Sequence, residues 1–156
     1  MTSLLLAGGL TDPNLQALAD HASTNDVSLI DLRGAPGEIP QLYFDLQTGH
    51  LIHEKARLSP TAAFLRADVF TKNAPPSYKH AMSGVIATLR GWCARQSAVQ
   101  VFNADPFGRS KSVNKAAALN AAASLGFTIP KTCIGNHKTP LSDWLEQGDV
   151  LIQKPV

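Results

Sequence analysis

The sequence has few residues of the kinds that mark specialised protein classes. Its 156 residues include only two cysteines, Cys93 and Cys133, and no CxxC or Cys/His cluster. This argues against a structural zinc site and favours two free thiols in a reducing compartment. The 14 basic residues barely outnumber the 12 acidic ones, and a net charge of +2 is too small to indicate a nucleic-acid binder. No apolar run approaches the roughly 18 residues that span a membrane. We therefore expect a cytoplasmic protein with neither nucleic acid nor membrane as a partner.

The common motifs of nucleotide binding and catalysis are also missing. There is no G-x-x-x-x-G-K loop, no G-x-G-x-x-G after a strand and no G-x-S-x-G elbow. The five histidines show no metal-binding spacing, and Asp45 and Asp105 have no evident partner. Gly8-Gly9 resembles half of a phosphate-binding turn, although a turn that ends a strand is the simpler interpretation. These residues by themselves predict no metal site and no catalytic residue.

The apolar residues that are present predict an α/β fold. Ser3–Ala7 and Val27–Leu32 have the pattern of short buried strands. Asp12-Pro13 is a good start for a helix between them, because Asp is a preferred N-cap and Pro suits the first helical turn. A strand–helix–strand unit predicts two parallel strands, and we expect Val99–Phe102 in the same sheet.

Further elements follow from turns and periodicity. Gln41–Leu46 and His50–His53 flank a Gln-Thr-Gly sequence whose glycine suits a left-handed turn, which predicts an antiparallel hairpin on the first α/β unit. Phe64–Phe70 is another strand candidate. Apolar residues of Tyr78–Gln96 recur on one stripe, so this segment is the clearest helix. Later in the chain we expect two helices, Asn114–Leu125 and Leu141–Glu146, and two strands, Thr128–Ile134 and Val150–Gln153. Gly126 should end the first of these helices in a left-handed conformation.

The stretch from residue 101 onward carries a resemblance to a known family. Asn114-Lys115 begins a predicted helix, Gly-Phe-Thr-Ile-Pro-Lys-Thr follows from Gly126, and an apolar strand ends in Lys154-Pro155. This order resembles the beginning of the ATP-grasp fold of D-alanine–D-alanine ligases and ribosomal-protein glutamate ligases. It is most similar to the ligases that install side-chain ester and amide links in microviridin-type peptides. The resemblance implies that Lys115 and Lys154 contact the phosphates of ATP.

The resemblance also implies an architecture and a reaction. Residues 1–110 would form a pre-ATP-grasp α/β domain, a mostly parallel sheet with helices on both faces and an antiparallel hairpin. Residues 111–156 would be the incomplete first part of an α+β ATP-grasp subdomain. The complete enzyme would use ATP and Mg²⁺ to join a carboxylate of a peptide or small molecule to an amine or hydroxyl through an acyl phosphate.

The family pattern then continues with parts that this sequence lacks: a glycine-rich loop, an adenine-binding hinge and the magnesium ligands. The resemblance therefore implies an N-terminal fragment that is inactive alone. We expect either disorder after about Lys138 or self-association of two chains through Val150–Gln153 and the neighbouring Thr128–Ile134. Two alternatives remain open. One is a non-catalytic module that binds a peptide or partner. The other is a nucleotide-binding domain of the receiver or flavodoxin type. Only Gly8-Gly9 and Asp31 point to that type.

Overall fold

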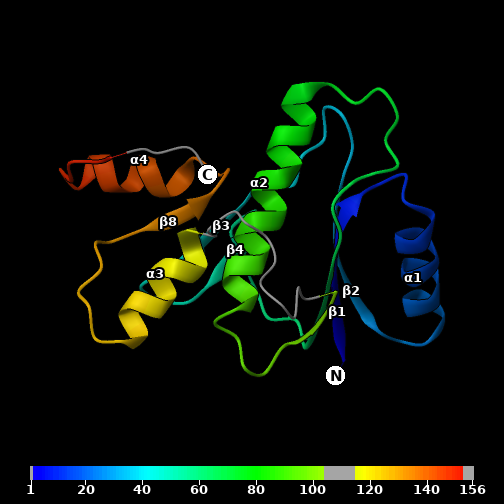
Figure 1. The fold of residues 1–156 in the computed structure, drawn as a ribbon, viewed down its shortest axis with the longest axis horizontal. Helices are drawn as coiled ribbons and strands as arrows, with labels where there is room; N and C mark the ends of the chain where they lie inside the picture. Colours follow the sequence, from blue (N-terminus) through cyan, green and yellow to red (C-terminus); the bar gives the residue numbers. More distant parts are fainter. Residues whose placement is uncertain (1, 104–114, 153–156) are drawn as a thin grey trace.

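The computed structural model describes residues 2–103 and 115–152. Over these residues the fold is α/β, with two four-stranded sheets and four helices. One sheet is parallel, in the order β2-β1-β6-β7, and the other is antiparallel, in the order β5-β4-β3-β8. Helix α2 contacts strands of both sheets and so joins the two parts of the core (Figure 1).

The parallel sheet contains the strand–helix–strand unit that the sequence predicts. Its strands are β1 (Ser3–Gly9), β2 (Ser28–Gly34), β6 (Ala62–Leu65) and β7 (Gln100–Phe102). Helix α1 (Pro13–Thr24) connects β1 to β2, and the Asp12 side chain caps it by accepting from the amides of Asn14 and Leu15. The prediction that the segments at 3–7, 27–32 and 99–102 share one sheet, with the first two parallel, is confirmed.

Helices cover both faces of this sheet, as expected. Leu5 and Ala7 of β1 belong to the core cluster that contains α2 (Pro76–Cys93). Leu6 is equally buried but lies outside that cluster, because successive side chains of a strand point to opposite faces. The apolar residues of α1 cover the face of Leu6. The helix predicted at 78–96 is confirmed, with its buried stripe facing the core.

The antiparallel strands form a sheet of their own rather than an extension of the first unit. They are β3 (Leu42–Asp45), β4 (Leu51–His53), β5 (Ala56–Leu58) and β8 (Cys133–Gly135). The predicted β3–β4 hairpin is confirmed, and Gly49 has the expected positive φ of 74°. Strand β5 was not predicted, because its turn is made by Glu54 and Lys55 at φ 47° and 76° without the usual glycine or asparagine.

Two helices accompany β8. Helix α3 (Lys115–Ser124) packs on α2 through buried Ala116, and the Asn120 side chain donates to the carbonyl of Gly91. Gly126 ends α3 with φ 84°, as predicted. Helix α4 (Thr139–Glu146) follows β8. None of the helices in residues 2–103 and 115–152 combines the length and apolar character that a membrane crossing needs.

Three predicted strands are wrong in extent. The segment predicted at 64–70 is paired only as far as Leu65, because Asp68 then accepts from the amides of Phe70 and Thr71 and turns the chain. The segment predicted at 128–134 is a strand only from Cys133, since Pro130 has no amide to donate and the Gln47 side chain takes the amide of Thr132.

The strand predicted at 150–153 is absent over residues 150–152, and Gln153 lies outside the described residues. A strand exists only with a hydrogen-bonded neighbour, and no described strand pairs with this segment.

Candidate functional site

The resemblance assigns two lysines to the phosphates of ATP, Lys115 and Lys154. Lys115 is the first residue of α3, and its side chain is exposed beside buried Ala116. Lys154 lies outside the described residues. The structure thus places Lys115 on the surface at the start of a helix.

The carboxyl ends of the parallel strands are the usual ligand site of an α/β sheet. In this protein the carboxyl group of Asp68 occupies that edge. A Cβ placed on Gly9 would lie 2.3 Å from the carboxyl carbon of Asp68, and one on Gly8 would lie 2.8 Å from the carbonyl oxygen of Arg66. Both glycines therefore make room for the segment that follows β6. A carboxylate against Gly9 would repel a phosphate, so Gly8-Gly9 is better explained as a structural turn.

Asp68 holds this edge together. Its Oδ1 accepts from the amides of Phe70 (3.0 Å) and Thr71 (3.1 Å), and its Oδ2 accepts from the hydroxyl of Tyr78 at 2.7 Å. Partial burial raises the pKa of Asp68, but the hydrogen bonds from Thr71 and Tyr78 outweigh it and hold that pKa below its usual value. Burial and the bond to Asp68 raise the pKa of Tyr78 to about 12. This network ties β1 and β6 to α2 and leaves no proton donor or acceptor poised for chemistry.

The remaining acids near this edge are also paired. Asp12 is fully buried; its Oδ1 caps α1, and its Oδ2 lies 3.1 Å from Nε of Arg66, at ion-pair distance but without the alignment of a hydrogen bond. Asp31 is bound by Arg33 at 2.6 Å. The described residues contain no group of three or more His, Cys, Asp or Glu side chains that could hold a metal ion. The described residues therefore contain no receiver-like acidic cluster.

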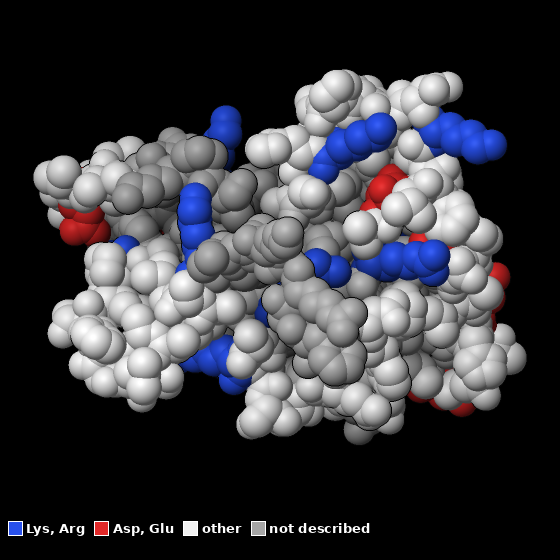
Figure 2. Space-filling view, viewed as in Figure 1, with Lys and Arg blue, Asp and Glu red and all other residues white. Residues whose placement is uncertain are grey.

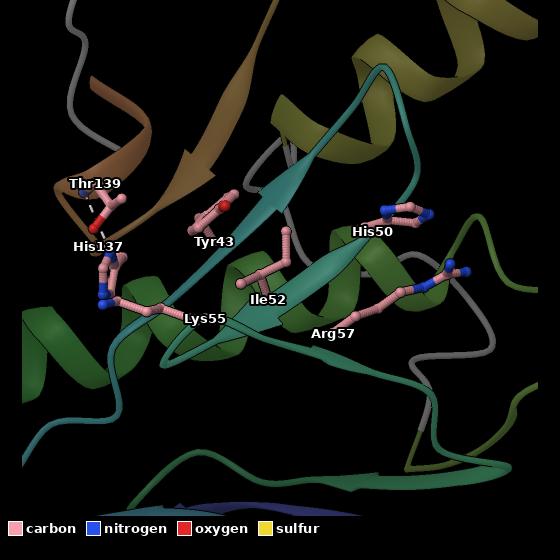
Figure 3. A pocket seen from close by; sticks show the side chains of 7 residues that line it. All are labelled: Tyr43, His50, Ile52, Lys55, Arg57, His137 and Thr139. Atoms are coloured by element: carbon pink, nitrogen blue, oxygen red, sulfur yellow. Dashed lines mark hydrogen bonds between the residues drawn. The ribbon is translucent and has the colours of Figure 1, made fainter. Parts of the chain in front are cut away.

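A different surface has the features of a binding site. The outer face of the antiparallel sheet carries an open concavity of about 300 Å³. Its lining comes from β3, β4, β5 and the segment after β8 (Figure 3): Tyr43, His50, Ile52, Lys55, Arg57, His137 and Thr139. The register explains why these residues meet: Tyr43 pairs with Ile52 and Ile52 with Arg57, which places the three side chains in one row across the sheet.

This concavity, called the outer-face site below, is basic. Its lining includes Lys55, Arg57 and two histidines but no carboxylate. Nδ1 of His137 accepts from the amide of Thr139 at 3.2 Å, so the neutral ring carries its proton on Nε2 and can donate it. In the view of Figure 2, basic side chains lie in several separate places rather than in one continuous stripe.

The site's chemistry is binding rather than covalent catalysis. Burial raises the pKa of Tyr43, and the charges of Cys133, Asp45 and Asp143 add to this effect, so the phenol stays protonated and can donate a hydrogen bond. Cys133, on the neighbouring strand, has its pKa raised to about 12 by burial and by Asp45. A thiol with that pKa is not a nucleophile at neutral pH.

Sequence analysis missed this site. His50 and Ile52 are two residues apart, as are Lys55 and Arg57, but the step of three between the pairs breaks the strand alternation, so no single pattern marks this face. His137 is distant in sequence, and only the pairing of β8 with β3 brings it to Tyr43, with ring centroids 6.1 Å apart.

Comparisons with known proteins reveal no relative of this chain. No family model matches it, and neither a search of curated proteins nor one of solved structures returns a match. Its function must be inferred from its own residues.

Proposed function

We propose that this chain forms the N-terminal part of an ATP-dependent carboxylate ligase of the ATP-grasp type. The complete enzyme would transfer the terminal phosphate of ATP to a carboxylate and then join the acyl phosphate to an amine or hydroxyl. Residues 1–110 would form the pre-ATP-grasp domain. Residues 111–156 would begin the nucleotide-binding subdomain, with Lys115 and Lys154 directed at the phosphates.

The observation that carries this proposal is the order of elements around the family's motifs. Lys115 begins α3 and is exposed, and Gly126 ends α3 with φ 84°. The Pro-Lys-Thr sequence from Pro130 leads into β8, and α4 follows. A lysine on the surface at a helix start can supply the point positive charge that a triphosphate needs.

Uncovered apolar side chains in the same region support the proposal. Among residues 115–152, five large apolar side chains are exposed: Leu125 75%, Phe127 67%, Leu145 61%, Val150 96% and Ile152 84%. Apolar surface of this kind indicates a contact with another polypeptide segment. A nucleotide-binding subdomain that packs on α3, β8 and α4 is such a segment.

We expect ATP binding by this chain to be no tighter than about millimolar, roughly 4 kcal/mol. Lys115 lies on the surface, and no described cluster could hold the Mg²⁺ that accompanies ATP.

Affinity labelling tests the proposal at such weak binding. An acyl-phosphate derivative of ATP transfers its acyl group to lysine amines beside the bound phosphates, and mass spectrometry locates the modified lysines. We expect Lys115 to be labelled several-fold faster than Lys79, an exposed lysine on α2. Excess ATP should suppress the labelling of Lys115, and adenosine should not.

Two results would contradict the proposal. Equal labelling of Lys115 and Lys79, insensitive to ATP, would remove the phosphate role of Lys115. Micromolar ATP binding that persists in a Lys115→Ala variant would mean that a nucleotide site of another kind exists in this chain.

A second candidate is a non-catalytic module that binds a peptide or a partner, including a second copy of the chain. The five exposed apolar side chains favour it as well. Labelling and light scattering together separate the two cases: labelling of Lys115 that ATP suppresses favours the ligase, whereas a dimer that dissociates in a Phe127→Glu variant and shows no such labelling favours the module.

A further inference from the structure

The outer-face site belongs to a sheet whose two faces have opposite character. Its inner face contributes Leu42, Phe44, Leu51 and Ile134 to the core beneath α2. Its outer face presents the row from Tyr43 through Ile52 to Arg57. The buried core residues of this sheet thus lie on its inner face, and the outer face presents side chains to solvent.

Each of the two cationic side chains of this site, Lys55 and Arg57, lies beside a histidine. Figure 3 shows the Lys55 side chain directed toward His137 at one end and the Arg57 guanidinium beside the His50 ring at the other. Ile52 lies between the two pairs, and Tyr43 lies next to Ile52 on the neighbouring strand. The arrangement is thus an apolar centre with positive charge on both sides.

The charges of Lys55 and Arg57 are not paired within the described part of the fold. Within the described residues, neither Lys55 nor Arg57 makes an ion pair or a side-chain hydrogen bond. No described acid forms an ion pair with these two side chains: Asp45 accepts from the amides of Gln47 and Thr48 in the turn after β3, and Glu54, which precedes Lys55 in the turn, takes part in none of the described salt bridges. The Lys55 backbone is held at φ 76°, which L-residues avoid, so a glycine would suit the fold better than this lysine.

The spacing of the charges selects the kind of anion. A single phosphate is bound by donors that converge on one point. Here the two pairs lie on opposite sides of an aliphatic side chain. An extended peptide offers separate carboxylates with apolar groups between them, and a strand-like backbone matches the flat surface of a sheet.

We propose that the outer-face site binds an acidic peptide segment, with carboxylates at the Lys55–His137 and Arg57–His50 pairs and an apolar side chain over Ile52. This inference rests on the contacts of the face and not on the ligase proposal, so the two fail separately. Carboxylates bound at a surface site are screened by salt, so binding weakens as ionic strength rises.

Fluorescence anisotropy of the full chain tests the site. The probe is a fluorescein-labelled pentapeptide with two glutamates on each side of a leucine, and its control replaces the glutamates by lysines. We expect the acidic peptide to bind and the basic one not to bind. Arg57→Ala should weaken binding about tenfold, the effect of losing one charged hydrogen bond. The matched control Arg90→Ala removes an exposed charge from α2 and should leave the affinity unchanged.

A second variant separates binding from folding. Lys55→Gly relieves the positive-φ backbone and should raise the melting temperature by about 1–3 °C while also weakening binding about tenfold. The matched control Lys79→Ala should change neither quantity.

Several outcomes would overturn the proposal. These are equal binding of the basic peptide, unchanged affinity in both Lys55→Gly and Arg57→Ala, or an equal loss in the α2 controls. Stronger competition by pyrophosphate or ATP than by unlabelled acidic peptide would show a phosphate site and would also exclude the peptide.

Discussion

Residues 3–102 and residues 115–152 bury their helices to very different extents. Helix α2 buries nine of its 18 residues, whereas α3 buries only Ala116 and α4 only Pro140. Most stability of a helix in a protein comes from packing of its apolar face rather than from its intrinsic propensity. The first region therefore holds its own structure, while the second depends on few contacts and presents apolar side chains to whatever packs on it.

The largest expected difference between the regions comes from removing a leucine. Leu89 of α2 is fully buried, so Leu89→Ala should lower the free energy of unfolding by about 2–5 kcal/mol. Leu125 is 75% exposed, and Leu125→Ala should change the free energy of unfolding by less than about 0.5 kcal/mol. Urea unfolding measures both values. Trp92 and Trp144 report the two regions separately when the other is replaced by Phe. Equal losses in the two variants would contradict the comparison.

The edge of the parallel sheet should be intolerant of a single methyl group. Gly9→Ala places a Cβ 2.3 Å from the Asp68 carboxyl carbon, and we expect it to destabilise the protein by about 1–3 kcal/mol. Gly84 in α2 is the matched control, since no atom lies within 4 Å of its added Cβ. Gly84→Ala should stabilise by about 0.5–1 kcal/mol, because alanine favours the helix. Thermal unfolding measures both, and a tolerated Gly9→Ala would mean that the 66–68 segment moves freely.

The Asp68 carboxylate should make the first region sensitive to acid. Its pKa lies below the ordinary value of 3.8, so the stability it adds is complete at neutral pH and is lost as the pH falls through the folded value. Asp68→Asn should therefore lower the free energy of unfolding by about 1–2 kcal/mol at pH 7, and by less as the pH falls toward 3. Asp149 is the control from the second region: its pair with Lys131 is 3.1 Å long but exposed. Asp149→Asn should change stability by less than about 1 kcal/mol. An Asp68→Asn effect that is the same at pH 7 and pH 3 would exclude this role.

The smallest effect is expected at Gly126. Its φ of 84° is unfavourable for other residues, although no atom lies within 4 Å of an added Cβ. Gly126→Val should lower stability by about 1 kcal/mol through backbone strain alone. Circular dichroism melting of this variant, with Gly126→Asn as a milder comparison, measures the effect. Unchanged melting of Gly126→Val would show that the end of α3 is not fixed in this conformation.

The sequence predicted elements well where the determining contacts are local. The N-cap at Asp12, the apolar stripe of α2 and the positive φ of Gly49 and Gly126 all follow from residues a few positions apart. Predictions were wrong where a strand ended through a distant partner. Asp68 turns the chain after β6 by accepting from the amides of Phe70 and Thr71, and the Tyr78 hydroxyl and the space beside Gly9, both distant in sequence, keep it there.

Of the two candidate sites, the lysines were predicted from a local motif and the outer-face site was not predicted. Lys115 was predicted from a motif and lies on the surface at the start of a helix, and Lys154 remains a prediction. The outer-face site was not predicted, because the turn at Glu54 and Lys55 has none of the usual turn residues.

The sequence by itself determined the helices, the parallel pairing of β1 with β2 and the residues that line the core, because burial periodicity and turn chemistry act over short distances. Only the tertiary structure decided that β8 pairs with β3 and that Lys55, Arg57 and two histidines share one face with Tyr43. The physical reason is strand register: side chains alternate between faces, so a shift of one residue would send this whole set to the other side.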